Sequence, residues 1–63
     1  MNKYGEVRGC MEIHGSVECV DDEFAEFFGL YIQDDKGLMM WDSDHETRED
    51  AEMVADEIGV TLW

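Results

Sequence analysis

The chain has 63 residues, of which 17 are acidic and only 4 are basic, so its formal net charge at neutral pH is −13. This length allows one domain, and so negative a chain is not expected to bind nucleic acid or an anionic membrane directly. A hydrophobic content of 44% with seven aromatic residues and no proline argues against a disordered tail. We therefore expect one small folded domain, residues 1–63, whose partner is basic.

No apolar stretch is long enough to span a membrane, and the first residues lack the apolar core of a signal peptide, which favours a cytoplasmic location. In that reducing compartment, Cys10 and Cys19 are expected to be buried small hydrophobes rather than a disulfide. Their spacing with His14 and His45 does not match a zinc site. The segment 42–53 begins like a calcium loop but lacks its glycine and its final glutamate. We expect neither a metal nor any other cofactor.

Residues 6–14 alternate between apolar and polar side chains, with Val7, Met11 and Ile13 on one side, as in a half-buried strand. A turn is expected at 14–16. The next residues, 17–20, fit either a second strand paired with the first or the approach to a helix, and the sequence leaves both open.

Residues 21–28 predict a helix, because acidic residues suit its start and Gly29 suits the position just after its end. Phe24, Phe27 and Phe28 then share one helical face with Val20, so we expect them in the core.

Residues 30–33 and 38–41 predict a hairpin around the turn 34–37, in which Gly37 takes the position that needs positive φ. In that register Ile32 lies opposite Met40 on one face, and Tyr31 lies opposite Trp41 on the other. The aromatic pair is either covered by another element or left exposed for a partner.

After a polar linker at 42–47, the spacing of apolar residues predicts a helix over 48–58, with Thr47 as its N-cap. Gly59 ends this helix before a short strand at 60–63. The sequence therefore predicts an α+β fold, with a small antiparallel or mixed sheet of three to five short strands and two helices.

The acidic residues are unevenly distributed. Residues 21–57 hold 14 carboxylates against only Lys36 and Arg48, a net charge of −12, whereas the first 20 residues hold three acids and two bases. Like charges three or four positions apart on a helix cost stability, and a surface selected for stability alone mixes the signs. No catalytic motif accompanies them, so the chain is not expected to be an enzyme.

Three interpretations of this charge remain open. The acids can form a decoy for nucleic-acid phosphates, which binds the basic groove of another protein. They can form a halophilic surface, in which case the protein unfolds at low ionic strength. They can also steer a module that docks through its hairpin aromatics.

The acid-rich segments 21–28 and 48–58, and the hairpin with Tyr31-Ile32-Gln33-Asp34, make the chain similar in kind to the small acidic DNA-mimic inhibitors encoded by phages. These include anti-CRISPR proteins, anti-restriction proteins and the uracil-DNA glycosylase inhibitor. The resemblance implies a non-catalytic inhibitor that occupies the basic DNA-binding groove of a host complex, for example a CRISPR surveillance complex. Whether two copies form a homodimer is left open. The expected contact residues are Asp22, Glu23, Glu26, Asp34, Asp35, Trp41, Asp42, Asp44, Glu49, Glu52 and Asp56.

Overall fold

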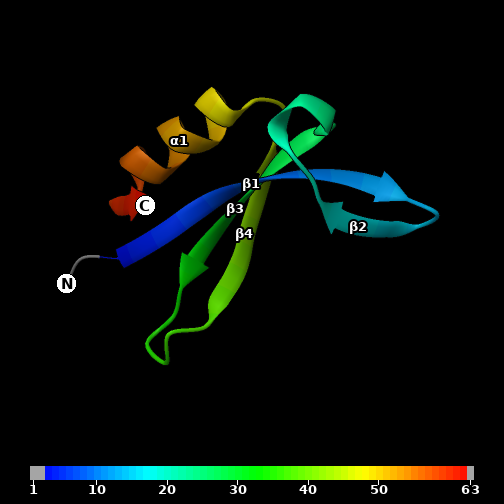
Figure 1. The fold of residues 1–63 in the computed structure, drawn as a ribbon. Coiled ribbons are helices and arrows are strands. Elements are labelled where there is room, and N and C mark those ends of the chain that lie inside the picture. Colours follow the sequence, from blue (N-terminus) through cyan, green and yellow to red (C-terminus); the bar gives the residue numbers. More distant parts are fainter. Residues whose placement is uncertain (1–2, 63) are drawn as a thin grey trace.

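The computed structural model describes residues 3–62, which form a five-stranded sheet and one α-helix (Figure 1). The elements are β1 (Lys3–Ile13), β2 (Ser16–Cys19), the 3-10 turn η1 (Asp22–Phe24), β3 (Phe27–Gln33), β4 (Met39–His45), α1 (Arg48–Glu57) and β5 (Val60–Leu62). The strands are ordered β2-β1-β3-β4, and β5 pairs in parallel with the beginning of β1. Both β2 and β5 lie on the side of β1 that faces away from β3, with β5 beside Gly5 and β2 beside Cys10.

The strand predicted over 6–14 is confirmed, although β1 already begins at Lys3. The alternative left open at 17–20 is decided in favour of a strand, because β2 pairs antiparallel with the end of β1. The turn between them consists of His14 and Gly15, both with positive φ, at 52° and 83°. Such a two-residue turn matches the twist of a hairpin and fixes its register.

The hairpin formed by β3 and β4 has the predicted register, with Ile32 opposite Met40 and Tyr31 opposite Trp41, and Gly37 has a φ of 84°. The register shifts between Leu30 and Tyr31, which leaves one extra residue on β4. The prediction of a linker over 42–47 is wrong, because β4 continues past this shift to His45.

The helix predicted over 21–28 is also wrong, so the α+β fold has one helix and not two. Only Asp22–Phe24 forms a 3-10 turn, and Phe27 already begins β3. Phe27 and Phe28 lie opposite residues of β1, so distant strand pairing outweighs the local helical spacing. Phe24, which was expected in the core, is 62% exposed.

The helix predicted over 48–58 is confirmed as α1. Its N-cap is Thr47, whose side-chain oxygen accepts a hydrogen bond from the backbone N–H of Asp50 at 3.1 Å. Gly59 has a φ of 80°, as the chain needs in order to leave a helix and enter β5. Ile58, the last residue of the predicted helix, is exposed.

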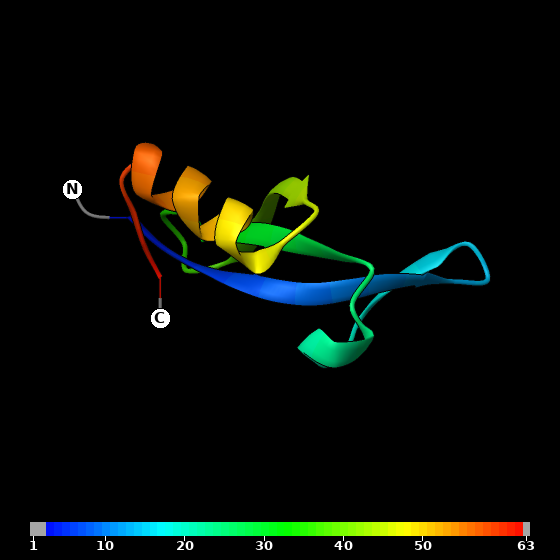
Figure 2. The same ribbon diagram turned by 90° about the horizontal axis from the view of Figure 1, so that it is seen from above.

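The core lies between α1 and one face of the sheet, which we call the covered face (Figure 2). Ala51 and Ala55 of α1 are fully buried, and their small side chains allow the helix to approach the sheet closely. Ala55 packs with Leu30 of β3 and Val60 of β5. In residues 3–62 no helix is long and apolar enough to cross a membrane.

Candidate functional site

The acidic residues predicted on the segment 48–58 lie on the outer side of α1. Glu49, Glu52 and Asp56 are exposed, whereas Ala51 and Ala55 are fully buried. A spacing of three and four residues places neighbouring Cβ atoms on a helix about 5 to 6 Å apart. The helix therefore presents a row of negative charge that faces away from the sheet.

The acidic residues of the expected N-terminal helix do not form such a row. Asp22 accepts hydrogen bonds from Nε and Nη2 of Arg48 at 2.6 and 2.7 Å, which joins η1 to the start of α1. These bonds lower the pKa of the Asp22 carboxyl. Glu26 accepts a hydrogen bond from the backbone N–H of Glu12 at 3.0 Å, while Glu23 is exposed within η1. Asp22 and Glu26 therefore help to hold the fold together.

The hairpin turn contains two further predicted contact residues. Asp34 Oδ1 accepts hydrogen bonds from the backbone N–H groups of Lys36 and Leu38, at 2.8 and 2.9 Å. A side chain that binds its own turn in this way stabilises the local backbone. Asp35 is exposed beside it at the tip of the hairpin. Of these two acids, Asp34 has a structural role in the turn.

The predicted residues of β4 lie on the outer strand of the sheet. Asp42 is exposed at the register shift, and Asp44 is exposed two residues later. Asp44 Oδ1 accepts a hydrogen bond from Nε1 of Trp41 at 2.8 Å, which fixes the direction of the indole ring. Asp44 lies over Gly29, on the face of the sheet opposite α1, whereas the remaining acids between Asp42 and Glu57 border one another because β4 leads into α1 and packs against it. We call these acids the β4–α1 acidic surface; its exposed carboxylates are Asp42, Glu46, Glu49, Asp50, Glu52, Asp56 and Glu57.

Both arginines of the chain are engaged in ion pairs within the protein. Arg8 pairs with Glu6, and Arg48 pairs with Asp22. The hydrogen bond that Arg48 donates to Asp22 is the main cause of a raised pKa of Arg48, and the charge of Glu52 adds to it. Arg48 is thus the one cation within residues 39–57, and its guanidinium is already held by η1.

The face of the sheet opposite α1, which we call the open face, carries aromatic side chains. The guanidinium of Arg8 lies over the ring of Tyr31, 4.5 Å from its centroid. A side chain at Gly29 would meet that ring at 2.9 Å, so the ring of Tyr31 lies over the glycine. Burial there raises the pKa of Tyr31. Trp41 is 59% exposed and Tyr4 is 45% exposed. Of the two outcomes left open for the hairpin aromatics, Tyr31 is therefore half-covered and Trp41 is available for contact.

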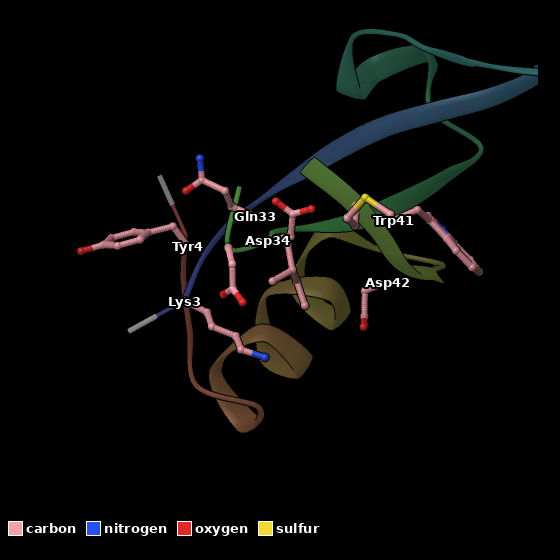
Figure 3. A pocket seen from close by; sticks show the side chains of 9 residues that line it. Lys3, Tyr4, Gln33, Asp34, Trp41 and Asp42 are labelled. Carbon is pink, nitrogen blue, oxygen red and sulfur yellow. The ribbon is translucent and has the colours of Figure 1, made fainter. Parts of the chain in front are cut away.

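A hollow of about 670 Å³ lies where the hairpin meets the beginning of β1 (Figure 3). Ile32 and Met40 contribute apolar surface to it, and Lys3 and Asp42 lie on opposite sides of it. Nothing in the local sequence marked this hollow, because it forms only when β1 pairs with β3 and brings Lys3 beside the hairpin. The same is true of the Arg8–Tyr31 contact, which joins residues 23 positions apart.

In the described residues 3–62, no group of three or more His, Cys, Asp or Glu side chains is arranged to hold a metal ion. No protein-family model, curated protein sequence or solved structure matches this chain. The surfaces whose chemistry points to a function are therefore the β4–α1 acidic surface and the open face.

Proposed function

We propose that the protein is a non-catalytic acidic inhibitor that occupies the basic nucleic-acid-binding groove of another protein in the bacterial cytoplasm. The observation that supports this proposal is the β4–α1 acidic surface, where seven exposed carboxylates follow one another along the chain and the one cation among them, Arg48, is itself paired with Asp22. A groove that binds a phosphate backbone carries lysine and arginine side chains. Because these positive side chains attract any dense array of negative charge, they also bind an array of carboxylates. Association would be fast, steered by charge and sensitive to salt.

The revised fold changes which acids serve this function. Asp22, Glu26 and Asp34 already accept hydrogen bonds within the protein, so they are poor substitutes for free phosphates. The carboxylates of α1 have no such bonds among the described residues, and Glu49 and Asp56 face solvent. The binding surface that we propose is therefore centred on α1 and β4 and not on two acidic helices.

The hollow beside the hairpin adds a contact suited to a basic partner. A lysine or arginine side chain combines an apolar stem with a charged end. Ile32 and Met40 offer apolar contact for the stem, and the carboxylates of Asp35 and Asp42 line the same hollow. Lys3 also lines the hollow, but three carboxylates, those of Asp34, Asp35 and Asp42, outnumber it, so the hollow still favours one basic side chain.

To test this function, Glu49, Glu52 and Asp56 are changed together to their amides. A bound protein is first captured from a bacterial lysate on the wild-type chain, and elution by duplex DNA is compared with elution by salt. Its affinity for wild type and for the triple variant is then measured over a range of salt concentrations. We expect the triple variant to bind at least tenfold more weakly and with a smaller salt dependence, since three charges are lost.

A matched control neutralises three exposed acids outside the β4–α1 surface, with Glu12→Gln, Glu18→Gln and Glu23→Gln. This control removes the same net charge and is expected to retain most of the affinity. An equal loss in both triple variants would show that only net charge matters. Unchanged binding by the α1 variant, or failure of DNA to compete, would exclude the mimic.

The exposed indole of Trp41 favours a second candidate function, a module that docks through the open face with charge providing only steering. In that case Trp41→Ala abolishes binding while the fold is kept, and the three amide changes on α1 mainly slow association. Affinity and association rate for the two variants, measured with the same captured protein, separate the two functions.

A further inference from the structure

The two cysteines of the chain lie directly opposite each other on neighbouring strands. Cys10 of β1 is the Cα partner of Cys19 of β2. Side chains at opposite positions of an antiparallel pair point to the same face of the sheet. The two-residue turn at His14 and Gly15 fixes this register, so the thiols face each other whenever the hairpin is formed.

The hydrogen bonds of the hairpin show which kind of pair this is. The backbone N–H of Val20 donates to the carbonyl of Gly9 at 2.9 Å. Because hydrogen-bonded and non-hydrogen-bonded positions alternate along an antiparallel pair, Cys10 and Cys19 occupy the next, non-hydrogen-bonded position. The Cα atoms of such a pair are about 4.5 Å apart, within the range that a disulfide spans. A bond between these sulfurs therefore requires little movement of the backbone.

The two thiols differ in their surroundings. Cys19 is exposed, whereas Cys10 is 1% exposed and donates a hydrogen bond from Sγ to the carbonyl of Arg8 at 3.3 Å. Burial raises the pKa of the Cys10 thiol. The pKa of the Arg8 guanidinium is raised mainly by Glu6 and further by Cys19, which places the exposed thiol near a positive charge. Of the two thiols, only Cys19 is therefore open to attack on an external disulfide.

We propose that Cys10 and Cys19 form a thiol–disulfide exchange site that takes a small-molecule disulfide such as oxidised glutathione. The Cys19 thiolate attacks one sulfur of that disulfide and releases one glutathione thiolate, which takes up the proton lost by Cys19. Cys10 then loses its proton and attacks the Cys19 sulfur, expelling the second glutathione as a thiol. The two cysteines are oxidised to an intrachain disulfide, and one external disulfide is reduced to two thiols.

The bond would act on a part of the sheet that has little other support. All four residues of β2 are exposed, and β2 pairs only with β1 among the described strands. In Figure 1 the β1–β2 hairpin extends away from α1. A disulfide at its base would hold β2 against β1 and limit opening of this hairpin, independently of any partner at the β4–α1 surface.

The proposal is tested on the full reduced chain, treated with oxidised glutathione and followed by intact mass spectrometry. We expect wild type to lose two hydrogen atoms and remain a monomer, with one peptide link between Cys10 and Cys19. Reduction by dithiothreitol should restore the starting mass. Amide hydrogen exchange in β2 should be slower in the oxidised form than in the reduced form.

Two variants separate the roles of the thiols. Cys10→Ala keeps a small apolar side chain in the buried position and should accumulate the mixed disulfide with glutathione at Cys19. Cys19→Ser should remain unmodified while folded, as checked by circular dichroism, and should react once urea exposes Cys10. The proposal is overturned if wild type stops at the mixed disulfide, if it forms only disulfide-linked dimers, or if folded Cys19→Ser reacts as fast as wild type.

Discussion

The two faces of the sheet carry different kinds of side chain. On the covered face, Leu30 is fully buried and packs with Ala55 and Val60 in an apolar cluster. On the open face, Arg8 stacks on Tyr31, and Trp41 donates to Asp44, with much of the indole exposed. Two large aromatic side chains thus lie outside the core, although a chain this short can bury only little apolar surface. The comparison indicates that the covered face maintains the fold and the open face is available for contact.

The two arginines are divided between the covered side and the open face. Arg48 lies 5.6 Å from the centroid of the Phe28 ring and joins α1 to η1, whereas Arg8 lies over Tyr31 and pairs with Glu6 within its own strand. Each cation is thus stacked on a ring and paired with one carboxylate. Because both are engaged in this way, neither is free to offset the acids around it.

The largest expected effect is on the covered face. Leu30→Ala should lower the free energy of unfolding by about 3 kcal/mol, because it removes buried contacts and leaves a cavity. Trp41→Ala, in the same hairpin but on the open face, should cost less than about 1 kcal/mol. Urea unfolding followed by circular dichroism measures both. If Leu30→Ala is unfolded in plain buffer, Leu30→Val provides a milder comparison. Similar costs at the two positions would show that the open face belongs to the core.

A smaller effect is expected at the N-cap of the helix that forms the covered face. Thr47→Ala removes the acceptor for the backbone N–H of Asp50 and should destabilise the protein by about 1 kcal/mol. Thr47→Ser keeps an acceptor and serves as the control, with a cost near zero. Faster amide hydrogen exchange in the first turn of α1 should accompany the loss. If the two variants are equally stable, the cap does not contribute to holding α1 on the sheet.

The sequence predicted the elements whose signals are local. Gly37 and its flanking residues specify the hairpin turn, and Thr47 and Gly59 mark the ends of α1 within one turn of each boundary. The helix predicted over 21–28 was wrong because the phenylalanines of this segment fit the spacing of a helix as well as that of a strand. Pairing of Phe27 with Cys10 of β1, 17 residues away, decided the outcome, and no local pattern records such a contact.

The candidate site, too, could be predicted only where its residues are set by local sequence. The row on α1 follows from helical spacing alone, so Glu49, Glu52 and Asp56 were placed correctly on an exposed face. The acids of β4 were assigned to a linker, because an outer strand with polar side chains resembles a loop in sequence. Asp22 was misplaced since its partner, Arg48, lies 26 residues away.

The smallest expected effect concerns that ion pair. Because the bond from Arg48 lowers the pKa of Asp22 in the folded protein, this carboxylate contributes stability above its unfolded pKa and loses the contribution as pH falls through the folded value. Protonation of the remaining carboxylates relieves repulsion at the same time, so the overall melting temperature is not a clean measure. The difference between wild type and Asp22→Asn is informative, since both share that background. Wild type should melt slightly higher near neutral pH, and the difference should vanish on acidification below the folded pKa. The control is Glu23→Gln, because Glu23 is a neighbour in η1 that accepts no hydrogen bond from Arg48. Its melting temperature should differ from that of wild type by the same amount at every pH. If the Glu23→Gln difference also vanishes on acidification, the effect arises from net charge and not from the ion pair that joins η1 to α1.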